Sequence, residues 1–270
     1  MNKNFDVVYD VAYGEHERQK LDFFIPQNKK TDAGIILFIH GGGWSSGDKR
    51  AHHSDAQFLC NLGFLCATMN YRFVTDNISV SDELDDITSA LTAIKDKCSE
   101  NGINIQKVIL SGASAGAHLS LLYAYTRLNE APITPVATCV WCPPVNCAAD
   151  DFLSGISCEF DDWKYDILSK CCAFKITKND FTEIKQQKAL KKISPEEYVA
   201  ETSIPTAVFH GKSDELVPLS HIHKFISLLN EKGVKNNFLL YENSGHALDK
   251  DPEISLQAKN IIADYAKMYF

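Results

Sequence analysis

Short apolar runs and amphipathic stretches alternate along most of the chain. The short runs are rich in β-branched residues and predict buried strands at Ile35–Ile39, Phe64–Met69, Val108–Leu110, Val136–Trp141, Pro205–His210 and Asn237–Tyr241. The longer stretches carry apolar residues at helical spacing and predict helices at Ala51–Leu62, Val80–Lys97, His118–Tyr125, Leu219–Lys232 and Pro252–Tyr269. Because right-handed crossovers join parallel strands, this alternation predicts an α/β fold, a mostly parallel central sheet with helices on both faces.

Two parts of the chain depart from the alternation. Phe5–Val11 and Gln19–Ile25 follow each other without a helix between them and predict an antiparallel pair that opens the sheet. The stretch 145–199 is too long for a simple connection and holds two amphipathic pieces, Asp161–Cys172 and Phe181–Lys192. We expect it to form a small cap inserted into a single domain that spans residues 1–270.

Charge and composition exclude several classes of protein. The net charge is -8 and no cluster of Lys and Arg stands out, so we expect no nucleic-acid partner. No apolar run is long enough to span a membrane and the first residues lack an apolar signal segment, which predicts a cytoplasmic protein. Nine cysteines is an odd number, and in a reducing compartment we expect free, buried thiols. The sequence does not indicate an oligomeric state.

The stretch 107–122 carries the first chemical motif. A short apolar strand runs into the pentapeptide Gly112-Ala113-Ser114-Ala115-Gly116, and a helical pattern follows at once. A chain that turns from strand to helix within a few residues crowds its backbone, and glycines at both ends of the pentapeptide relieve that crowding. This G-x-S-x-G context is that of a nucleophile elbow, in which the serine hydroxyl is exposed at the turn. The competing interpretation is an ordinary small-residue turn with a structural serine.

A glycine-rich loop follows the predicted strand Ile35–Ile39. Its sequence is HGGGW, residues 40–44, and three successive glycines allow backbone N–H groups to face a cavity. Such amides stabilise the oxyanion of an acyl-transfer intermediate. We expect donors from Gly42 and Gly43 and, after the serine, from Ala115. His40 is expected to brace this loop.

A carboxylate and a histidine follow two later strands, also at strand ends. Asp214 comes after Pro205–His210, with Glu215 as its neighbouring competitor, and His246 lies in the Gly-flanked loop after Asn237–Tyr241. Since parallel strands end at one edge of a sheet, Ser114, Asp214 and His246 are expected to meet there as nucleophile, acid and base. This chemistry requires no metal and no cofactor. The remaining candidates are expected on helices or at the surface: His52, His53, His118, His221 and His223.

These motifs together resemble those of a known group of enzymes. HGGGW with Gly47-Asp48-Lys49, NYR at 70–72, GASAGAHLS, IPTAVFHGKSDELVPL and ENSGHAL resemble the α/β-hydrolase esterases of the acetyl-esterase and hormone-sensitive-lipase-like group. The chain looks most similar to the branch related to bacterial feruloyl and acetylxylan esterases, over about residues 18–265. The resemblance implies the same triad and oxyanion positions. It does not extend residue by residue into the predicted cap, so it leaves the substrate open.

The leading hypothesis is a serine carboxylesterase of short- to medium-chain acyl esters, with acetyl as the expected acyl group and a small-molecule ester as substrate. Trp44, Tyr71 and Trp163 are expected to supply apolar walls of its pocket, although aromatic residues at these places also suit core packing. An aryl formamidase or a small-peptide hydrolase with the same triad is the alternative. A non-catalytic binding protein of the same fold is disfavoured, because all three triad members are present.

Overall fold

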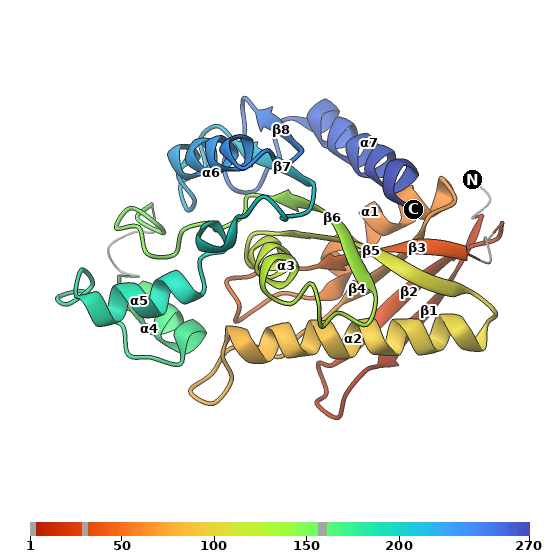
Figure 1. The fold of residues 1–270 in the computed structure, drawn as a ribbon, viewed down its shortest axis with the longest axis horizontal. Helices are drawn as coiled ribbons and strands as arrows, with labels where there is room; N and C mark the ends of the chain where they lie inside the picture. Colours follow the sequence, from red (N-terminus) through yellow and green to blue (C-terminus); the bar gives the residue numbers. More distant parts are fainter. Residues whose placement is uncertain (1–3, 29–31, 156–160) are drawn as a thin grey trace.

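The computed structural model describes residues 4–28, 32–155 and 161–270. In this part of the chain eight strands form one sheet: β1 (Phe5–Ala12), β2 (Lys20–Pro26), β3 (Asp32–Ile39), β4 (Leu65–Met69), β5 (Asn104–Ala113), β6 (Thr134–Trp141), β7 (Thr206–Gly211) and β8 (Asn236–Tyr241) (Figure 1). The α-helices are α1 (His53–Asn61), α2 (Val80–Glu100), α3 (Ala115–Thr126), α4 (Asp161–Cys172), α5 (Ile184–Lys192), α6 (Leu219–Glu231) and α7 (Pro252–Tyr269). The described residues also form the short 3-10 helices η1 (Lys49–His52) and η3 (Pro195–Tyr198).

The sheet has the strand order β1-β2-β4-β3-β5-β6-β7-β8. β1 and β2 pair in antiparallel fashion and β2 is antiparallel to β4, whereas every pairing from β4 onward is parallel. The predicted antiparallel opening and the predicted parallel sheet are therefore confirmed. The carboxyl ends of β3, β5, β6, β7 and β8 consequently lie at one edge, and the loops that leave them are neighbours.

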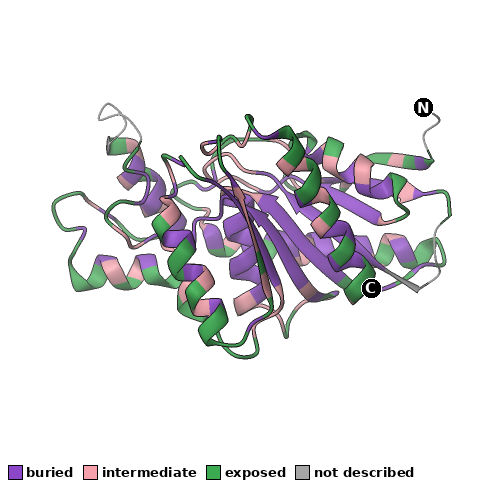
Figure 2. Cartoon of the chain, turned by 90° about the horizontal axis from the view of Figure 1, so that it is seen from above, coloured by how far each residue is buried: buried purple, intermediate pink, exposed green. Residues whose placement is uncertain are grey.

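Helices cover the sheet on both faces, because the central strands are apolar on both sides. On β3, Ile35, Leu37 and Ile39 pack into one core cluster while Ile36 and Phe38 pack into the other, as the alternation of side chains in a strand requires. Residues of α1 and α7 belong to the second cluster, and residues of α2, α3 and α6 to the first. Figure 2 shows the result, with buried strands enclosed between half-exposed helices.

The predicted helix Ala51–Leu62 differs at its start from the observed one. The side chain of Asp48 accepts a hydrogen bond from the backbone N–H of Arg50, which begins the 3-10 turn η1, and α1 follows only at His53. The sequence therefore predicted the helix but not the turn that leads into it. This turn matters because it places His52 beside the sheet rather than on the solvent side of a helix.

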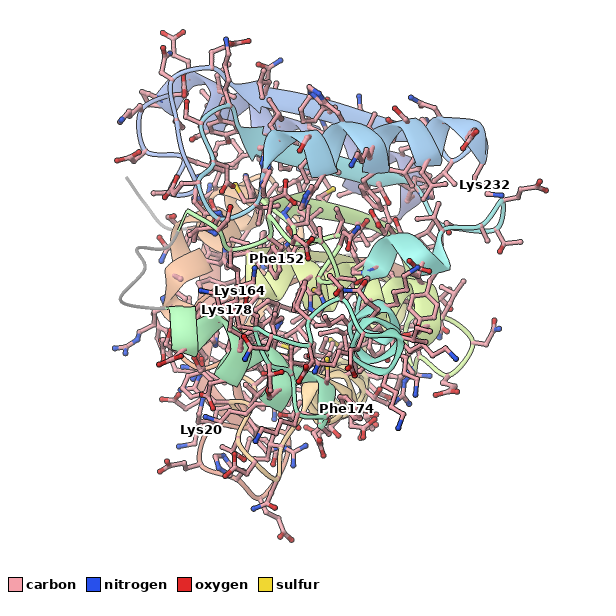
Figure 3. The ribbon with its side chains drawn as sticks, turned by 90° about the vertical axis from the view of Figure 1, so that its left-hand side faces the viewer. Lys20, Phe152, Lys164, Phe174, Lys178 and Lys232 are labelled. Atoms are coloured by element: carbon pink, nitrogen blue, oxygen red, sulfur yellow. The ribbon has the colours of Figure 1, made fainter. Side chains whose placement is uncertain are left out.

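The segment between β6 and β7 contains α4, α5 and η3, close to the two pieces that the sequence predicted. Nζ of Lys164 on α4 donates to the backbone carbonyl of Asp150 at 3.0 Å, which ties α4 to the stretch after β6 (Figure 3). The N–H of Leu153 donates to the carbonyl of Leu216 at 2.9 Å, which ties the same stretch to the loop after β7. Residues 156–160 of the predicted cap lie outside the described residues.

Two further observations bear on predictions from composition. None of the described helices is both long enough and apolar enough to cross a membrane. The eight cysteines in the described ranges are free thiols, and all but Cys172 are buried. Cys158 lies outside those ranges.

Candidate active site

Ser114 sits at the turn from β5 into α3 with a backbone conformation that is rare outside glycine. Its φ is 54° and its ψ is -119°. The two flanking glycines are required by close backbone approach: a Cβ atom on Gly112 would lie 2.4 Å from the carbonyl oxygen of Ile39, and one on Gly116 would lie 2.0 Å from the same oxygen. The strained turn therefore holds Ser114 at the end of the strand.

The structure brings Ser114, Asp214 and His246 together from three separate loops. Nε2 of His246 lies 2.9 Å from Oγ of Ser114, and Nδ1 of His246 lies 2.8 Å from Oδ2 of Asp214. Since an ionised carboxylate only accepts hydrogen bonds, the imidazole donates from Nδ1 to Asp214. Nε2 is then left to accept the proton of the Ser114 hydroxyl.

Asp214 is fixed as an ionised acceptor by its own loop. Its Oδ1 accepts the backbone N–H groups of Leu216 and Val217, each at 2.9 Å. Burial by itself would raise the pKa of Asp214, but the hydrogen bond and charge of His246, with the N–H of Val217, outweigh it and hold the pKa below its ordinary value. The carboxylate thus remains charged where it faces the imidazole.

Glu215, the competitor for the acid position, takes a different place. Its Oε2 accepts the backbone N–H of His246 at 3.3 Å, whereas the imidazole of His246 bonds to Asp214. Glu215 therefore holds the loop that carries His246 rather than the ring itself. Asp214 is the carboxylate with the geometry of a triad acid.

The HGGGW loop runs beside Ser114, as the sequence predicts for an oxyanion loop. A Cβ atom on Gly41 would lie 3.2 Å from the Cβ of Ser114. Gly42 and Gly43 adopt positive φ values of 117° and 58°, which open the backbone in a way that other residues rarely allow. Ala115 is the first residue of α3, so its N–H has no partner within the helix.

Trp44 does not line the pocket that contains Ser114, contrary to the expectation from sequence. It is 2% exposed, and its indole N–H donates to Nδ1 of His118 at 3.1 Å. Nε2 of His118 in turn donates to the carbonyl of Ile193 at 2.6 Å, and burial lowers the pKa of His118 to about 4, so the ring is neutral. This buried bridge connects the HGGGW loop, α3 and the segment that returns to β7.

Tyr71 is also a core residue and not a pocket wall. It is fully buried, its hydroxyl donates to the carbonyl of His40 at 3.0 Å, and its ring stacks on His40 at 4.4 Å between centroids. Burial lowers the pKa of His40 to about 4, and its Nδ1 lies 2.6 Å from the carbonyl oxygen of Gly41. His40 therefore braces the loop, as the sequence analysis expected.

Trp163 packs against the HGGGW loop. A Cβ atom on Gly43 would be 3.2 Å from Cζ2 of Trp163, so the indole edge lies against the HGGGW loop. The side chain comes from α4, and it is half-buried. Trp163, like Trp44 and Tyr71, is not among the residues that line the cavity at Ser114, but it lies against Gly43 of the HGGGW loop.

A cavity of about 390 Å³ opens at Ser114. Its lining combines the end of β6, the loop after β8 and two helices: His52, Asp55, Ala113, Ser114, Trp141, Cys142, Tyr241, His246, Ala247, Leu248, Ser255 and Lys259. Sequence reasoning missed most of these residues and assigned His52 to a helix or the surface. For Cys142, the one sequence signal that could have predicted a place in the cavity was its position at the carboxyl end of β6. The places of His52 and Lys259 in the lining depend on how α1 packs against α7, which no local pattern predicts.

Within the described ranges, one group of possible metal ligands was found, and it overlaps the triad. The ligand atoms of Cys142, Asp214 and His246 all lie within 4.8 Å of one another. Two of them already share a hydrogen bond, and burial raises the pKa of the Cys142 thiol well above its ordinary value, so the thiol stays protonated. The group therefore fits the acid–base pair of a triad better than a metal centre.

The comparisons with known proteins agree with this geometry. Residues 21–149 match the BD-FAE family model, and residues 158–270 match the model of the prolyl oligopeptidase family. Among solved structures, a truncated carbohydrate esterase from gut microbiota superposes with a TM-score of 0.79, at 18% identity, over 100% of this chain and 98% of that one. At that identity the likeness concerns the fold alone, and the fold is that of an α/β hydrolase.

The chain is also similar in sequence to two named ester hydrolases. The chain is 26% identical to the probable isoprenylcysteine alpha-carbonyl methylesterase ICME of Oryza sativa subsp. japonica, over 89% of this chain and 58% of that protein. It is 29% identical to the probable carboxylic ester hydrolase LipM of Mycobacterium tuberculosis, over 82% of this chain and 51% of that protein. The chain thus spans little more than half the length of these relatives. Both relatives are named as ester hydrolases, an isoprenylcysteine methylesterase and a carboxylic ester hydrolase.

Proposed function

We propose that this protein is a serine carboxylesterase that hydrolyses short- to medium-chain acyl esters, with acetyl as the preferred acyl group. The observation that carries the proposal is the continuous hydrogen-bonded chain from Ser114 through His246 to Asp214, with distances of 2.9 and 2.8 Å. Ester hydrolase relatives support the reaction class. We infer the acetyl preference from the resemblance of the motifs.

The reaction proceeds in two steps. In the first, His246 takes the proton of Ser114 while Oγ attacks the ester carbonyl, and the imidazolium then gives that proton to the leaving alcohol. In the second, His246 activates a water molecule, which hydrolyses the acyl-enzyme and frees Ser114. Asp214 keeps the imidazole in the tautomer that accepts at Nε2 and stabilises the imidazolium.

Backbone amides stabilise the charge that develops on the carbonyl oxygen. We assign this role to the N–H groups of Gly42 and Gly43 in the HGGGW loop and of Ala115, the first residue of α3. One donor of this kind contributes about 3 kcal/mol to the stability of the transition state. The bridge from Trp44 to His118 holds the glycine loop in place and so contributes indirectly.

The segment between β6 and β7 acts in this proposal as a cap over the site. Trp163 on α4 reaches the oxyanion loop beside Gly43, so the cap contributes a wall to the substrate pocket. A cytoplasmic location and a single hydrolase domain for residues 1–270 remain predictions from the sequence.

An amide substrate is the second candidate. The match of residues 158–270 to the prolyl oligopeptidase family favours a small-peptide hydrolase, and an aryl formamidase would use the same residues. Amides have poorer leaving groups than esters, so these reactions depend more strongly on proton donation by His246. The triad geometry alone is compatible with either bond.

Hydrolysis of p-nitrophenyl esters from acetate to octanoate tests the proposal. We expect the rate to fall with acyl length, and we expect Ser114→Ala to abolish it. Ser227→Ala, on the exposed side of α6, serves as the control and should leave the rate unchanged. Hydrolysis of formanilides or aminoacyl p-nitroanilides without hydrolysis of any ester would move the assignment to the amide alternative.

A further inference from the structure

The cavity at Ser114 has both apolar and polar lining residues. Ala113, Trp141 and Leu248 are among the apolar ones. The polar lining comes from charged, imidazole and hydroxyl-bearing side chains of η1, α1, β8 and α7: His52, Asp55, Tyr241, Ser255 and Lys259. A simple alkyl ester offers these groups no hydrogen bond, so its binding would desolvate them without compensation.

Asp55 contacts two of the other polar residues of the lining. Nδ1 of His52 donates to Oδ2 of Asp55 at 2.9 Å, and Nζ of Lys259 lies 3.0 Å from Oδ1. Burial by itself would raise the pKa of Asp55, but its contacts with His52 and Lys259 outweigh burial and keep the pKa below its ordinary value. The carboxylate therefore balances the ammonium group, and the pair carries no net charge.

Two side chains that line the cavity have hydrogen-bonding capacity that the described residues do not use. His52 is 7% exposed, and its Nε2 is a buried nitrogen for which the described residues provide no partner. The imidazole is stacked against Phe38 and Trp141, so it cannot turn away freely. The Lys259 side chain is 23% exposed, and an ammonium group has more N–H donors than its one ion pair uses.

The location of the cavity indicates which half of an ester would enter it. Its lining includes His246 and the following loop but neither Gly42 nor Gly43. In a serine hydrolase the carbonyl oxygen faces the oxyanion loop, whereas the leaving group faces the histidine that protonates it. The cavity is therefore on the leaving-group side. The helices α1 and α7, which both contribute lining residues, are neighbours (Figure 1).

We propose that this cavity is a leaving-group subsite in which His52, Asp55 and Lys259 bind a hydroxyl group carried by the alcohol half of the ester. A hydroxyl donates one hydrogen bond and accepts others, so it matches a cluster that offers both acceptors and an ammonium donor. A carboxylate would be repelled by Asp55 and an ammonium by Lys259, which favours a neutral group. This inference rests on the proposed esterase function, because it assigns the substrate of that same site.

Matched pairs of acetates test the subsite. 4-Hydroxybutyl acetate and pentyl acetate differ only by a hydroxyl in place of a methyl group, and 6-hydroxyhexyl acetate and heptyl acetate form a longer pair. We expect wild-type kcat/KM to favour the hydroxyl ester of at least one pair by about tenfold, the effect of one hydrogen bond to a charged or buried partner. A wild-type ratio near one for both pairs overturns the subsite.

Two variants on different elements locate the effect. Lys259→Met removes the ammonium but keeps an unbranched side chain, and His52→Phe keeps the stacking with Phe38 and Trp141. Each should bring the hydroxyl-to-methyl ratio close to one while the alkyl ester is still hydrolysed. Lys267→Met is the matched control, since Lys267 is also on α7 and also paired to a carboxylate, Asp264 at 2.8 Å, but exposed. Its ratio should equal that of the wild type.

The remaining outcomes separate this proposal from the function on which it rests. Because both esters of a pair are measured on the same preparation, partial unfolding of a variant cancels in the ratio. A wild-type preference that survives in both Lys259→Met and His52→Phe overturns the subsite while leaving the esterase intact. Failure of the wild type to hydrolyse any of these acetates overturns the esterase proposal and the subsite together.

Discussion

The buried bridge from Trp44 through His118 to the carbonyl of Ile193 makes a quantitative prediction. Trp44→Phe keeps an aromatic ring in the core but removes the indole N–H, which leaves Nδ1 of the buried His118 without its donor. An unsatisfied buried acceptor costs about 1–3 kcal/mol, and the smaller ring adds a packing loss. We therefore expect the free energy of unfolding to fall by at least that amount.

A double-mutant cycle isolates the hydrogen bond from the packing loss. In a His118→Leu background the indole N–H already lacks its acceptor, so Trp44→Phe should cost less there than in the wild type. The coupling energy from urea unfolding of the four proteins should be about 1 kcal/mol or more, as for contacting residues in one network.

Enzyme kinetics of the same variants separate a bracing role from a pocket wall. If Trp44 braces the oxyanion loop, Trp44→Phe should lower kcat for all p-nitrophenyl esters alike and leave the dependence on acyl length unchanged. A coupling energy near zero, together with an altered acyl-length preference, would refute the bridge and restore Trp44 to the pocket.

Three further predictions concern the triad, a buried carboxyl group and the elbow. Asp214→Asn should lower kcat on the order of 10⁴-fold, because the imidazole loses its tautomer and its charge partner; Glu215→Gln, measured in the same ester assay, should retain most activity, and equal losses would contradict the assignment. Burial raises the pKa of Glu83 well above its ordinary value of 4.5, so the wild type loses about 1.4 kcal/mol of stability per pH unit as pH rises above 4.5 toward the raised pKa. Glu83→Gln should remove this loss, and urea unfolding at several pH values would show parallel curves if the reasoning failed. Gly116→Ala places a Cβ 2.0 Å from the carbonyl oxygen of Ile39, so it should destabilise the fold by about 3 kcal/mol or more; an unchanged Tm would contradict the close approach.

The sheet and the three triad residues follow from local patterns that the sequence displays directly. The apolar run 35–39 predicts a strand buried on both faces, and the structure divides its residues between two core clusters. Ser114, Asp214 and His246 each follow a parallel strand, and parallel strands bring their ends to one edge regardless of loop detail. The order of these residues along the chain and their positions after strands were therefore enough to predict that they lie close together.

The walls of the site depend on packing between distant segments, which no local pattern encodes. Trp44 follows two glycines with positive φ and itself has a φ of 58°, and its side chain packs inward against His118. The sequence shows only that an aromatic residue follows the predicted oxyanion loop, and it does not predict the direction of its side chain. The position of His52 likewise depends on the turn η1 and on the approach of α7 to α1, because its partner Asp55 is shared with Lys259.

The central claim is that Ser114 is the nucleophile of this site. Labelling with a fluorophosphonate, followed by peptide mass spectrometry, tests it most directly, because the reagent bonds covalently to an activated serine. We predict rapid, stoichiometric labelling of the peptide that contains Ser114, no labelling of the Ser114→Ala variant, and strongly slowed labelling of the His246→Ala variant. A folded wild-type protein that hydrolyses esters while its label resides on another residue, or that hydrolyses them equally well as Ser114→Ala, would contradict it.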